Sequence, residues 1–186
     1  MATAADAMVA RVSDRPGPHP RAMPLIRRYR EDDWPALGPI LHETFAAGDT
    51  YAFDPATSLA EIHRAWIELP AATFVACTPE GRVVGTYYIK ANQPGLGSHV
   101  CNCGYVVAPD VQGRGIASAL CEHSQVEAIT LGFRAMQFNL VVSTNQRAIR
   151  LWQRLGFAIV GRLPNAFRHR SLGFVDALVM YKVLAS

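Results

Sequence analysis

The stretch that decides the fold is Tyr105–Ala117, with the sequence YVVAPDVQGRGIA. An apolar run typical of a buried strand enters a turn with two glycines, and the pattern of a long helix follows at once. Such a turn leaves backbone N–H groups unpaired at the positive end of the helix dipole. These groups can hold an anion, because glycine lets a phosphate approach the backbone closely. The same glycines are equally compatible with a turn that needs them only for its geometry.

Two well-known phosphate-binding motifs do not fit this turn. A P-loop requires Gly-Lys followed by Ser or Thr, and the chain contains no such tripeptide. The dinucleotide fingerprint requires a third glycine where this chain has Ser118, and an acidic residue at the end of the next strand. The next apolar run instead ends in Ser143, Thr144 and Asn145. A nicotinamide-dependent enzyme is therefore disfavoured.

The composition is that of an ordinary globular protein. The chain has 186 residues, of which 50% are hydrophobic and 18% charged, enough for one domain but not comfortably for two. The formal charge of +3 is small and the basic residues are not clustered, so we expect no nucleic-acid partner. No apolar run approaches the roughly 18 residues that cross a bilayer, so we expect no membrane association. The four cysteines are too few for a disulfide scaffold and lack zinc-site spacing, so we expect reduced thiols, no metal and a cytoplasmic location.

Outward from the turn, strand and helix patterns fill most of the chain. Prolines interrupt residues 1–23, which we expect to be a disordered tail, and residues 24–186 are expected to form a single domain. Strands are predicted over 25–28, 73–77, 82–91, 99–107, 136–142, 157–162 and 176–184. One helix is predicted to run through Trp34, Leu37, Ile40 and Leu41, and further helices over about 58–69, 113–131 and 146–155. A long loop is expected between the last two strands. The order predicts a mixed α/β protein.

Two separated motifs resemble the signature of the GCN5-related N-acetyltransferases, the GNAT superfamily. Gln112-x-x-Gly115-x-Ala117 resembles the first motif, Arg/Gln-x-x-Gly-x-Gly/Ala. Asn145-x-x-Ala148-x-x-Leu151-Trp152, followed by Leu155-Gly156-Phe157, resembles the second. The resemblance covers about residues 25–184. It implies a central mixed, mostly antiparallel twisted sheet of about seven strands flanked by about four helices, with acetyl-CoA as co-substrate and no metal.

The resemblance also implies how acetyl-CoA binds. Backbone amides of the turn would wrap the pyrophosphate, with contributions from Gln112, Gly113, Arg114, Gly115, Ile116 and Ala117. The end of the preceding strand, Tyr105, Val106 and Val107, would pair with the pantetheine arm like an added strand, and one N–H would polarise the thioester carbonyl. Asn145 would hydrogen-bond the pantetheine or phosphate region. It is also suited to cap the helix that follows it.

The acid and base of the reaction stay open in the sequence. Many family members carry a tyrosine where this chain has Trp152, and that phenol can protonate the departing thiolate. Indole is too weak an acid, so we expect Trp152 to pack against the cofactor or in the core, and Tyr105, Tyr181 or water to supply the proton. Otherwise the thiolate leaves unprotonated.

Several polar residues are candidates for removing the proton of the incoming ammonium. His99 lies on the strand that faces the cofactor, as does Asn102, which would act by orienting a water. Asp49 and Asp54 lie on the loop between the first two helices. Each of these side chains is also compatible with a purely structural or surface position.

The loop around residues 48–53 lies where the family builds its acceptor pocket. Asp49 would take an ammonium, and Tyr51 and Phe53 would form an aromatic wall or, equally, plug the core. Asn139, in the middle of an apolar strand, pairs with a neighbour or points into the pocket. Arg168, His169 and Arg170 would bind a carboxylate or form a solvated face. The layout resembles family members that acetylate small amines, including amino acids, amino-acid analogues and toxic amines.

Two other functions are compatible with the same residues. The chain could be a catalytically weak or inactive acyl-CoA-binding or sensor module of the same fold, which the presence of Trp152 favours. A covalent route through Cys101 or Cys103 with His99 is the second alternative, since these residues share a face of one strand. The resemblance also makes a homodimer plausible.

Overall fold

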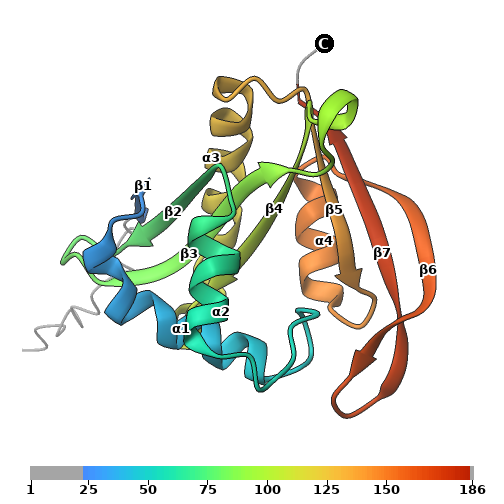
Figure 1. Cartoon of the computed structure of the whole chain (residues 1–186), viewed down its shortest axis with the longest axis horizontal. Helices are drawn as coiled ribbons and strands as arrows, with labels where there is room; N and C mark the ends of the chain where they lie inside the picture. Colours follow the sequence, from blue (N-terminus) through green and yellow to red (C-terminus); the bar gives the residue numbers. More distant parts are fainter. Residues whose placement is uncertain (1–22, 185–186) are drawn as a thin grey trace, which may run out of the picture.

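Seven strands form one twisted sheet in the order β1-β2-β3-β4-β5-β7-β6 (Figure 1). The computed structural model describes residues 23–184, so the tail expected over residues 1–23 lies outside the described residues except for Met23. The strands are β1 Leu25–Arg28, β2 Ala72–Cys77, β3 Val83–Ala91, β4 Val100–Val107, β5 Ala135–Val142, β6 Ala158–His169 and β7 Gly173–Val183. Neighbouring strands pair antiparallel, except that β4 and β5 run parallel. The predicted mixed, mostly antiparallel sheet is confirmed.

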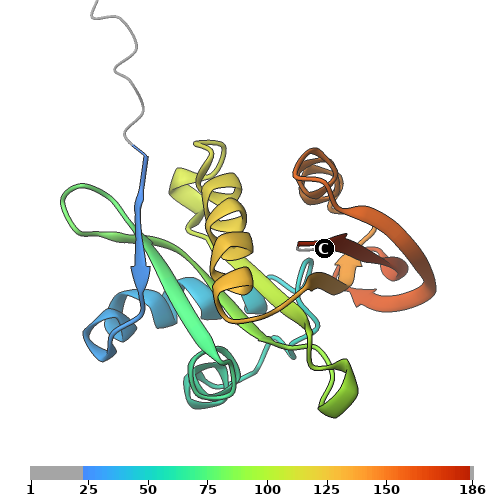
Figure 2. The same cartoon turned by 90° about the horizontal axis from the view of Figure 1, so that it is seen from above.

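Four α-helices cover the sheet, two on each face. They are α1 Trp34–Ala46, α2 Leu59–His63, α3 Ile116–Thr130 and α4 Gln146–Arg154. Helices α1 and α2 lie on one face, and α3 and α4 on the other (Figures 1 and 2). Each pair buries its own core, with Trp66 at the centre of the first and Leu120 and Met136 in the second. Short helical turns complete the described chain: η1 Glu31–Asp33, η2 Arg64–Glu68, η3 Gly95–Gly97 and η4 Pro109–Val111. No helix over residues 23–184 is both long and apolar enough to cross a bilayer.

Two predicted helices differ from the observed ones in their boundaries. The helix expected from Gly113 begins only at Ile116, because Gly113 and Gly115 have φ angles of 83° and 86°, in the left-handed region that a helix excludes. The helix expected over 58–69 is capped by Ser58 as α2, but after His63 it continues as a π-helical turn, η2.

The long loop predicted between the last two strands is wrong. Strands β6 and β7 extend toward each other as a hairpin that pairs as far as His169 and Gly173. Pro164 and Asn165, which suggested a loop, sit in a register shift between Leu163 and Phe167. The Asp176 carboxylate holds this irregularity by accepting a hydrogen bond of 3.0 Å from the Asn165 N–H. The hairpin tip reaches the loop after α1, where the Arg170 N–H donates to the Gly48 carbonyl over 3.0 Å.

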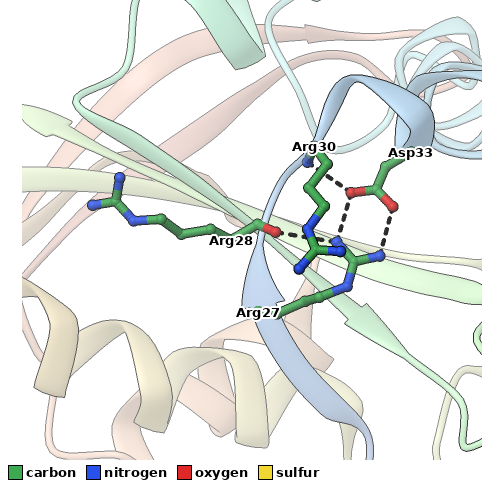
Figure 3. Close-up of polar contacts among 4 residues, drawn as sticks. All are labelled: Arg27, Arg28, Arg30 and Asp33. Atoms are coloured by element: carbon green, nitrogen blue, oxygen red, sulfur yellow. Dashed lines mark hydrogen bonds and ion pairs between the residues drawn. The ribbon is translucent and has the colours of Figure 1, made fainter.

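An ion pair between Arg27 and the buried carboxylate of Asp33 connects β1 to the turn before α1 (Figure 3). The Arg27 guanidinium donates to both oxygens of the Asp33 carboxylate, each over 2.7 Å, and the Arg30 N–H adds a third bond of 2.8 Å. The Asp33 side chain is only 8% exposed. Hydrogen bonding from Arg27 lowers the pKa of Asp33 below its ordinary value.

The feature that positions the functional site is the divergence of β4 from β5. The two strands pair only where Val100 lies beside Ala135 and Cys101 beside Met136. Strand β4 then stays with β3 as far as Val107, while β5 stays with β7. The facing edges of β4 and β5 are therefore unpaired beyond this point, and backbone groups are left pointing into the gap.

Candidate active site

A cleft of about 770 Å³ opens where β4 and β5 diverge. Its walls come from the second half of β4, the glycine turn before α3, the second half of β5, the inner face of α4 and the loop after α1. Every residue predicted to bind the cofactor lines it except Arg114, namely Tyr105, Val106, Val107, Gln112, Gly113, Gly115, Ile116, Ala117, Asn145 and Trp152. The structure thus gathers two motifs that are separated in the sequence.

The glycine turn forms one end of the cleft. At Gly115, the position of an added Cβ has no atom within 4 Å, so the backbone is open on that side. The Arg147 guanidinium lies beside the turn, with Nη2 3.3 Å from the corresponding position on Gly113. Arg147 and Arg154, two turns apart on α4, also line the cleft. An open backbone at the start of a 15-residue helix, with the Arg147 guanidinium beside it, is suited to a diphosphate.

Sequence reasoning missed Arg147 and Arg154. Both lie in the helix that carries the second motif, and Arg147 follows Asn145 by two residues. The signal that the sequence offered was their spacing of seven residues, because this spacing places both side chains on one face of a helix. Asn145 itself caps α4, because its Oδ1 accepts from the Ala148 N–H over 3.1 Å, and its side chain also borders the cleft.

The edge of β4 is occupied at one point by a side chain from the loop after α1. The Tyr51 hydroxyl accepts a hydrogen bond of 2.8 Å from the Tyr105 N–H and donates one of 2.9 Å to the Tyr105 carbonyl. Backbone N–H and C=O groups alternate in direction along a strand, so those of Val107 point to the same side of β4 as those of Tyr105. An extended chain that adds to this edge can therefore pair with Val107, and it meets the Tyr51 hydroxyl at Tyr105, two residues earlier in β4.

The other end of the cleft is aromatic and polar. Phe53 and Tyr51 pack against Phe45, with ring centroids 4.2 Å and 5.1 Å from its ring. Both residues therefore line the cleft and also contact the core. Tyr88 and Lys90, which the sequence did not single out, come from β3, and the Lys90 ammonium lies 5.2 Å from the Tyr88 ring. Both belong to the same wall.

Two amides predicted as site residues also lie at this end. Asn102 accepts from the Tyr88 hydroxyl over 2.9 Å and donates to the Gln137 carbonyl over 2.9 Å. Asn139 donates to Asn92 over 2.6 Å and is exposed in the cleft. Side-chain amides held in this way present fixed donors and acceptors to whatever binds beside them.

The remaining predicted acid–base residues are not brought to the cleft. His99 and Tyr181 line a separate shallow depression, and the His99 ring lies 3.1 Å from the Leu96 carbonyl. Asp49 is exposed and outside the lining, and Asp54 accepts from the Ala56 N–H within its own loop. Within residues 23–184, no carboxylate or imidazole lines the cleft.

Comparison with known proteins gives the family. Residues 26–157 match the model of the acetyltransferase (GNAT) family. The chain belongs to this family. It is 39% identical to a GCN5-related N-acetyltransferase from Kribbella flavida, whose structure superposes with a TM-score of 0.81 over 86% of this chain and 96% of that one. A phosphinothricin acetyltransferase from Sinorhizobium meliloti, solved in complex with acetyl-CoA, shares the fold (TM-score 0.79, 21% identity, 88% of this chain and 90% of that one).

A curated relative, the N-acetyltransferase aca1 of Schizosaccharomyces pombe, is 41% identical over 98 residues. That match covers 52% of this chain and 47% of aca1. The chain spans about half the length, or less, of the curated relatives it matches. The GNAT resemblance stated from the two motifs is thus confirmed.

Two residues that were considered for chemistry pack in or against the core, Trp152 buried and Tyr105 partly buried. Trp152 is 8% exposed and packs beside Phe138, with ring centroids 5.2 Å apart. The Tyr105 hydroxyl lies 2.7 Å from that of Ser124 on α3, and burial raises the pKa of Tyr105 well above its ordinary value. Neither presents an acidic proton to the open part of the cleft.

The covalent alternative finds no support in the arrangement of its residues. Cys103 borders the cleft, whereas His99 lines the separate depression and Cys101 is fully buried. Burial also raises the pKa of Cys103. In the described residues, no group of three His, Cys, Asp or Glu side chains is placed to hold a metal ion.

Proposed function

We propose that this chain transfers an acetyl group from acetyl-CoA to the amine of a small molecule, by direct attack of the amine in a ternary complex. The observation that carries the proposal is the cleft between β4 and β5, which has a phosphate-suited end and a separate aromatic and amide end. One domain, from residue 24 onward, would perform the reaction. The four cysteines are buried and reduced in the structure, which supports a reducing compartment such as the cytoplasm.

The cofactor half of the proposal follows from the shape of the cleft. The pyrophosphate would lie on the amides of the turn around Gly115, beside Arg147. The pantetheine arm would then run along β4 and pair with Val107 as an added strand does. This order along the strand brings the thioester to the level of Tyr105 and Tyr51. Acetyl-CoA bound in this way delivers its acetyl carbon to the boundary between the two ends of the cleft.

The acceptor half supports an amino acid or an amino-acid analogue. Among residues 23–184, Lys90 is the cation that lines the aromatic end of the cleft, whereas Arg147 and Arg154 line the side that α4 forms. The Lys90 ammonium, together with the amides of Asn102 and Asn139, is suited to bind a carboxylate. Since no carboxylate or imidazole from residues 23–184 lines the cleft, the amine would enter as its free base.

A second candidate function is an acyl-CoA-binding module without turnover. Trp152, in the position where many family members have a tyrosine, is the observation that favours it. Such a module would keep the phosphate end and Val107, and would bind acetyl-CoA without acceptor-dependent release of thiol. A homodimer is compatible with either function and stays a prediction.

The purified chain tests both candidates in one experiment. Thermal unfolding with acetyl-CoA, and with NADPH and ATP as controls, reports cofactor binding. A ligand at 100 times its dissociation constant adds about 2.7 kcal/mol to the unfolding free energy. Acetyl-CoA is then incubated with a panel of amino acids and amines while free thiol is recorded. Stabilisation with acceptor-dependent thiol release supports the enzyme; stabilisation without release from any acceptor supports the binding module.

A further inference from the structure

The groups available for proton transfer in the cleft form a short set. The ionisable side chains that line it, within residues 23–184, are three tyrosines, one cysteine, one lysine and two arginines: Tyr51, Tyr88, Tyr105, Cys103, Lys90, Arg147 and Arg154. The Tyr105 hydroxyl is turned to Ser124 on α3, and the Tyr88 hydroxyl donates to Asn102. The remaining phenol, that of Tyr51, is bound to the edge of the strand along which the cofactor would lie.

The position of the Tyr51 hydroxyl is fixed from several sides. Its two hydrogen bonds to the backbone of Tyr105 hold the oxygen on the free edge of β4. The ring contacts Phe45 and Trp66, with centroids 5.1 Å and 5.6 Å away. A Cβ on Gly104 would lie 3.2 Å from the hydroxyl oxygen, so a glycine there gives the phenol room to approach the strand. The oxygen is therefore preorganised.

This hydroxyl retains capacity for one more partner. A phenol has one proton to donate and two lone pairs that accept. The proton goes to the Tyr105 carbonyl and one lone pair takes the Tyr105 N–H. The second lone pair can accept from the N–H of an acceptor amine, and a small rotation about the C–O bond turns the proton from the carbonyl toward the sulfur of a thioester at the same level of β4.

We propose that Tyr51 is the catalytic residue that relays a proton from the attacking amine to the departing sulfur of CoA. The inference rests on the proposed function. The free amine adds to the thioester carbonyl, which forms the C–N bond and leaves a proton on a positively charged nitrogen. As the C–S bond breaks, its electron pair goes to sulfur, which takes the Tyr51 proton. The phenol oxygen takes the proton from nitrogen, so the amide, the free thiol and the original phenol result.

The electrostatic surroundings of Tyr51 agree with this role. Burial raises the pKa of Tyr51 well above its ordinary value, so its hydroxyl is protonated in the resting cleft. A phenol in this state cannot act as a base before the amine attacks. It can give up its proton when it receives another, which is what a relay through a single oxygen requires.

The test replaces the hydroxyl and keeps the ring. Tyr51→Phe should lower kcat by about 100-fold or more, the lower range for general acid–base catalysis, with unchanged affinity for acetyl-CoA. Tyr87→Phe is the matched control. Tyr87 is a buried tyrosine on β3, and its hydroxyl bonds to His123 outside the cleft, so this variant should lose a side-chain hydrogen bond and keep the kcat of the wild type.

A second variant separates proton transfer from structural support. Incorporation of 3,5-difluorotyrosine at position 51 keeps the hydroxyl and makes it more acidic. It should retain much more activity than Tyr51→Phe and should show a loss of kcat at alkaline pH that the wild type lacks. A difluorotyrosine enzyme with the pH profile of the wild type would overturn the relay.

Three outcomes distinguish this inference from the proposed function. An active wild type and a Tyr51→Phe variant of equal kcat would overturn the relay and leave the acetyltransferase in place. A lower rate explained entirely by weaker acetyl-CoA binding would overturn it too, since the phenol would then serve only to hold the cofactor. A wild type that acetylates no amine in the panel would overturn the proposed function, and the relay with it.

Discussion

The rings of Trp152 and Tyr105 lie against each other with centroids 5.0 Å apart, and this contact joins α4 to β4 at the floor of the cleft. Trp152 stands at the motif position where many family members carry a tyrosine. Because the indole is 8% exposed and packed against Tyr105 and Phe138, Trp152→Phe should keep most of the kcat and cost about 1–3 kcal/mol of stability through imperfect repacking.

Steady-state kinetics and thermal unfolding of Trp152→Phe check this expectation. A smaller aromatic ring preserves the contact with Tyr105, so the affinity for acetyl-CoA should change little. If kcat instead falls by orders of magnitude while acetyl-CoA still stabilises the protein, then the indole takes part in the chemistry. In that case the proton relay through Tyr51 would need revision as well.

The residues that line the glycine-turn end of the cleft could be predicted from the sequence because they are local. A strand, two glycines and a helix are consecutive around Gly115, and the chemistry of that turn belongs to the backbone. The residue proposed here for proton transfer could not be assigned that role in the same way. Tyr51 reaches Tyr105 across 54 positions of sequence, and that contact depends on how the loop after α1 packs on Phe45.

Gly115→Glu should abolish most acetyl-CoA binding without unfolding the domain. The new carboxylate would stand where the diphosphate is proposed to lie, so like charges and steric overlap should weaken affinity by more than about tenfold, or 1.4 kcal/mol. Gly132, at the other end of α3, provides a control for the backbone strain that a side chain causes at a positive φ. It has the same φ of 86° and equally open surroundings.

The comparison of Gly115→Glu with Gly132→Glu therefore isolates the effect on the cofactor. Both variants should lose similar thermal stability, because each puts a side chain in a left-handed conformation. Titration calorimetry with acetyl-CoA should show a loss only for Gly115→Glu. Undiminished affinity in that variant would mean that the pyrophosphate lies elsewhere.

The ion pair between Arg27 and Asp33 predicts a defined dependence of stability on pH. The pKa of Asp33 is lowered in the folded chain relative to the roughly 3.9 of an unfolded aspartate. The pair therefore contributes fully above pH 4 and is lost as the pH falls through the depressed value. Asp33→Asn should remove about 2 kcal/mol at neutral pH, because two charged hydrogen bonds to a buried side chain are lost.

Denaturant unfolding of the wild type and Asp33→Asn across the acid range checks this prediction. The difference in unfolding free energy should be constant near neutrality and shrink below pH 4. Asp110→Asn is the control, since Asp110 also pairs with an arginine, Arg82, but on an exposed surface, and it should leave the midpoint unchanged. A difference for Asp33→Asn that does not change with pH would show that packing, not charge, is lost.

The hairpin of β6 and β7 shows a further limit of sequence patterns. Pro164 and Asn165 are turn residues locally, but the pairing of Leu163 with Ala177 and of Phe167 with Val175 continues around them. Pairing across the sheet outweighs the local preference because the bulge confines the irregular residues to one short stretch. The consequence reaches the site, since the hairpin tip carries Arg170 to the loop that holds Tyr51.

Lys90 is the residue that should distinguish acceptors with a carboxylate from those without one. Replacement by methionine keeps a side chain of similar length over Tyr88 and removes the charge. If Lys90 binds the carboxylate of an amino-acid substrate, Lys90→Met should lower kcat/KM for that substrate by about tenfold or more, since a hydrogen bond to a charged group contributes about 1.5–3 kcal/mol. The corresponding amine without the carboxylate should be acetylated equally well by both proteins.

Arg168→Met is the control, because Arg168 is an exposed cation on the hairpin outside the cleft lining, and it should affect neither acceptor. Equal losses for both acceptors with Lys90→Met would assign Lys90 to the architecture of the cleft wall, and equal activity on the amino acid would place the carboxylate on Asn102 and Asn139 alone.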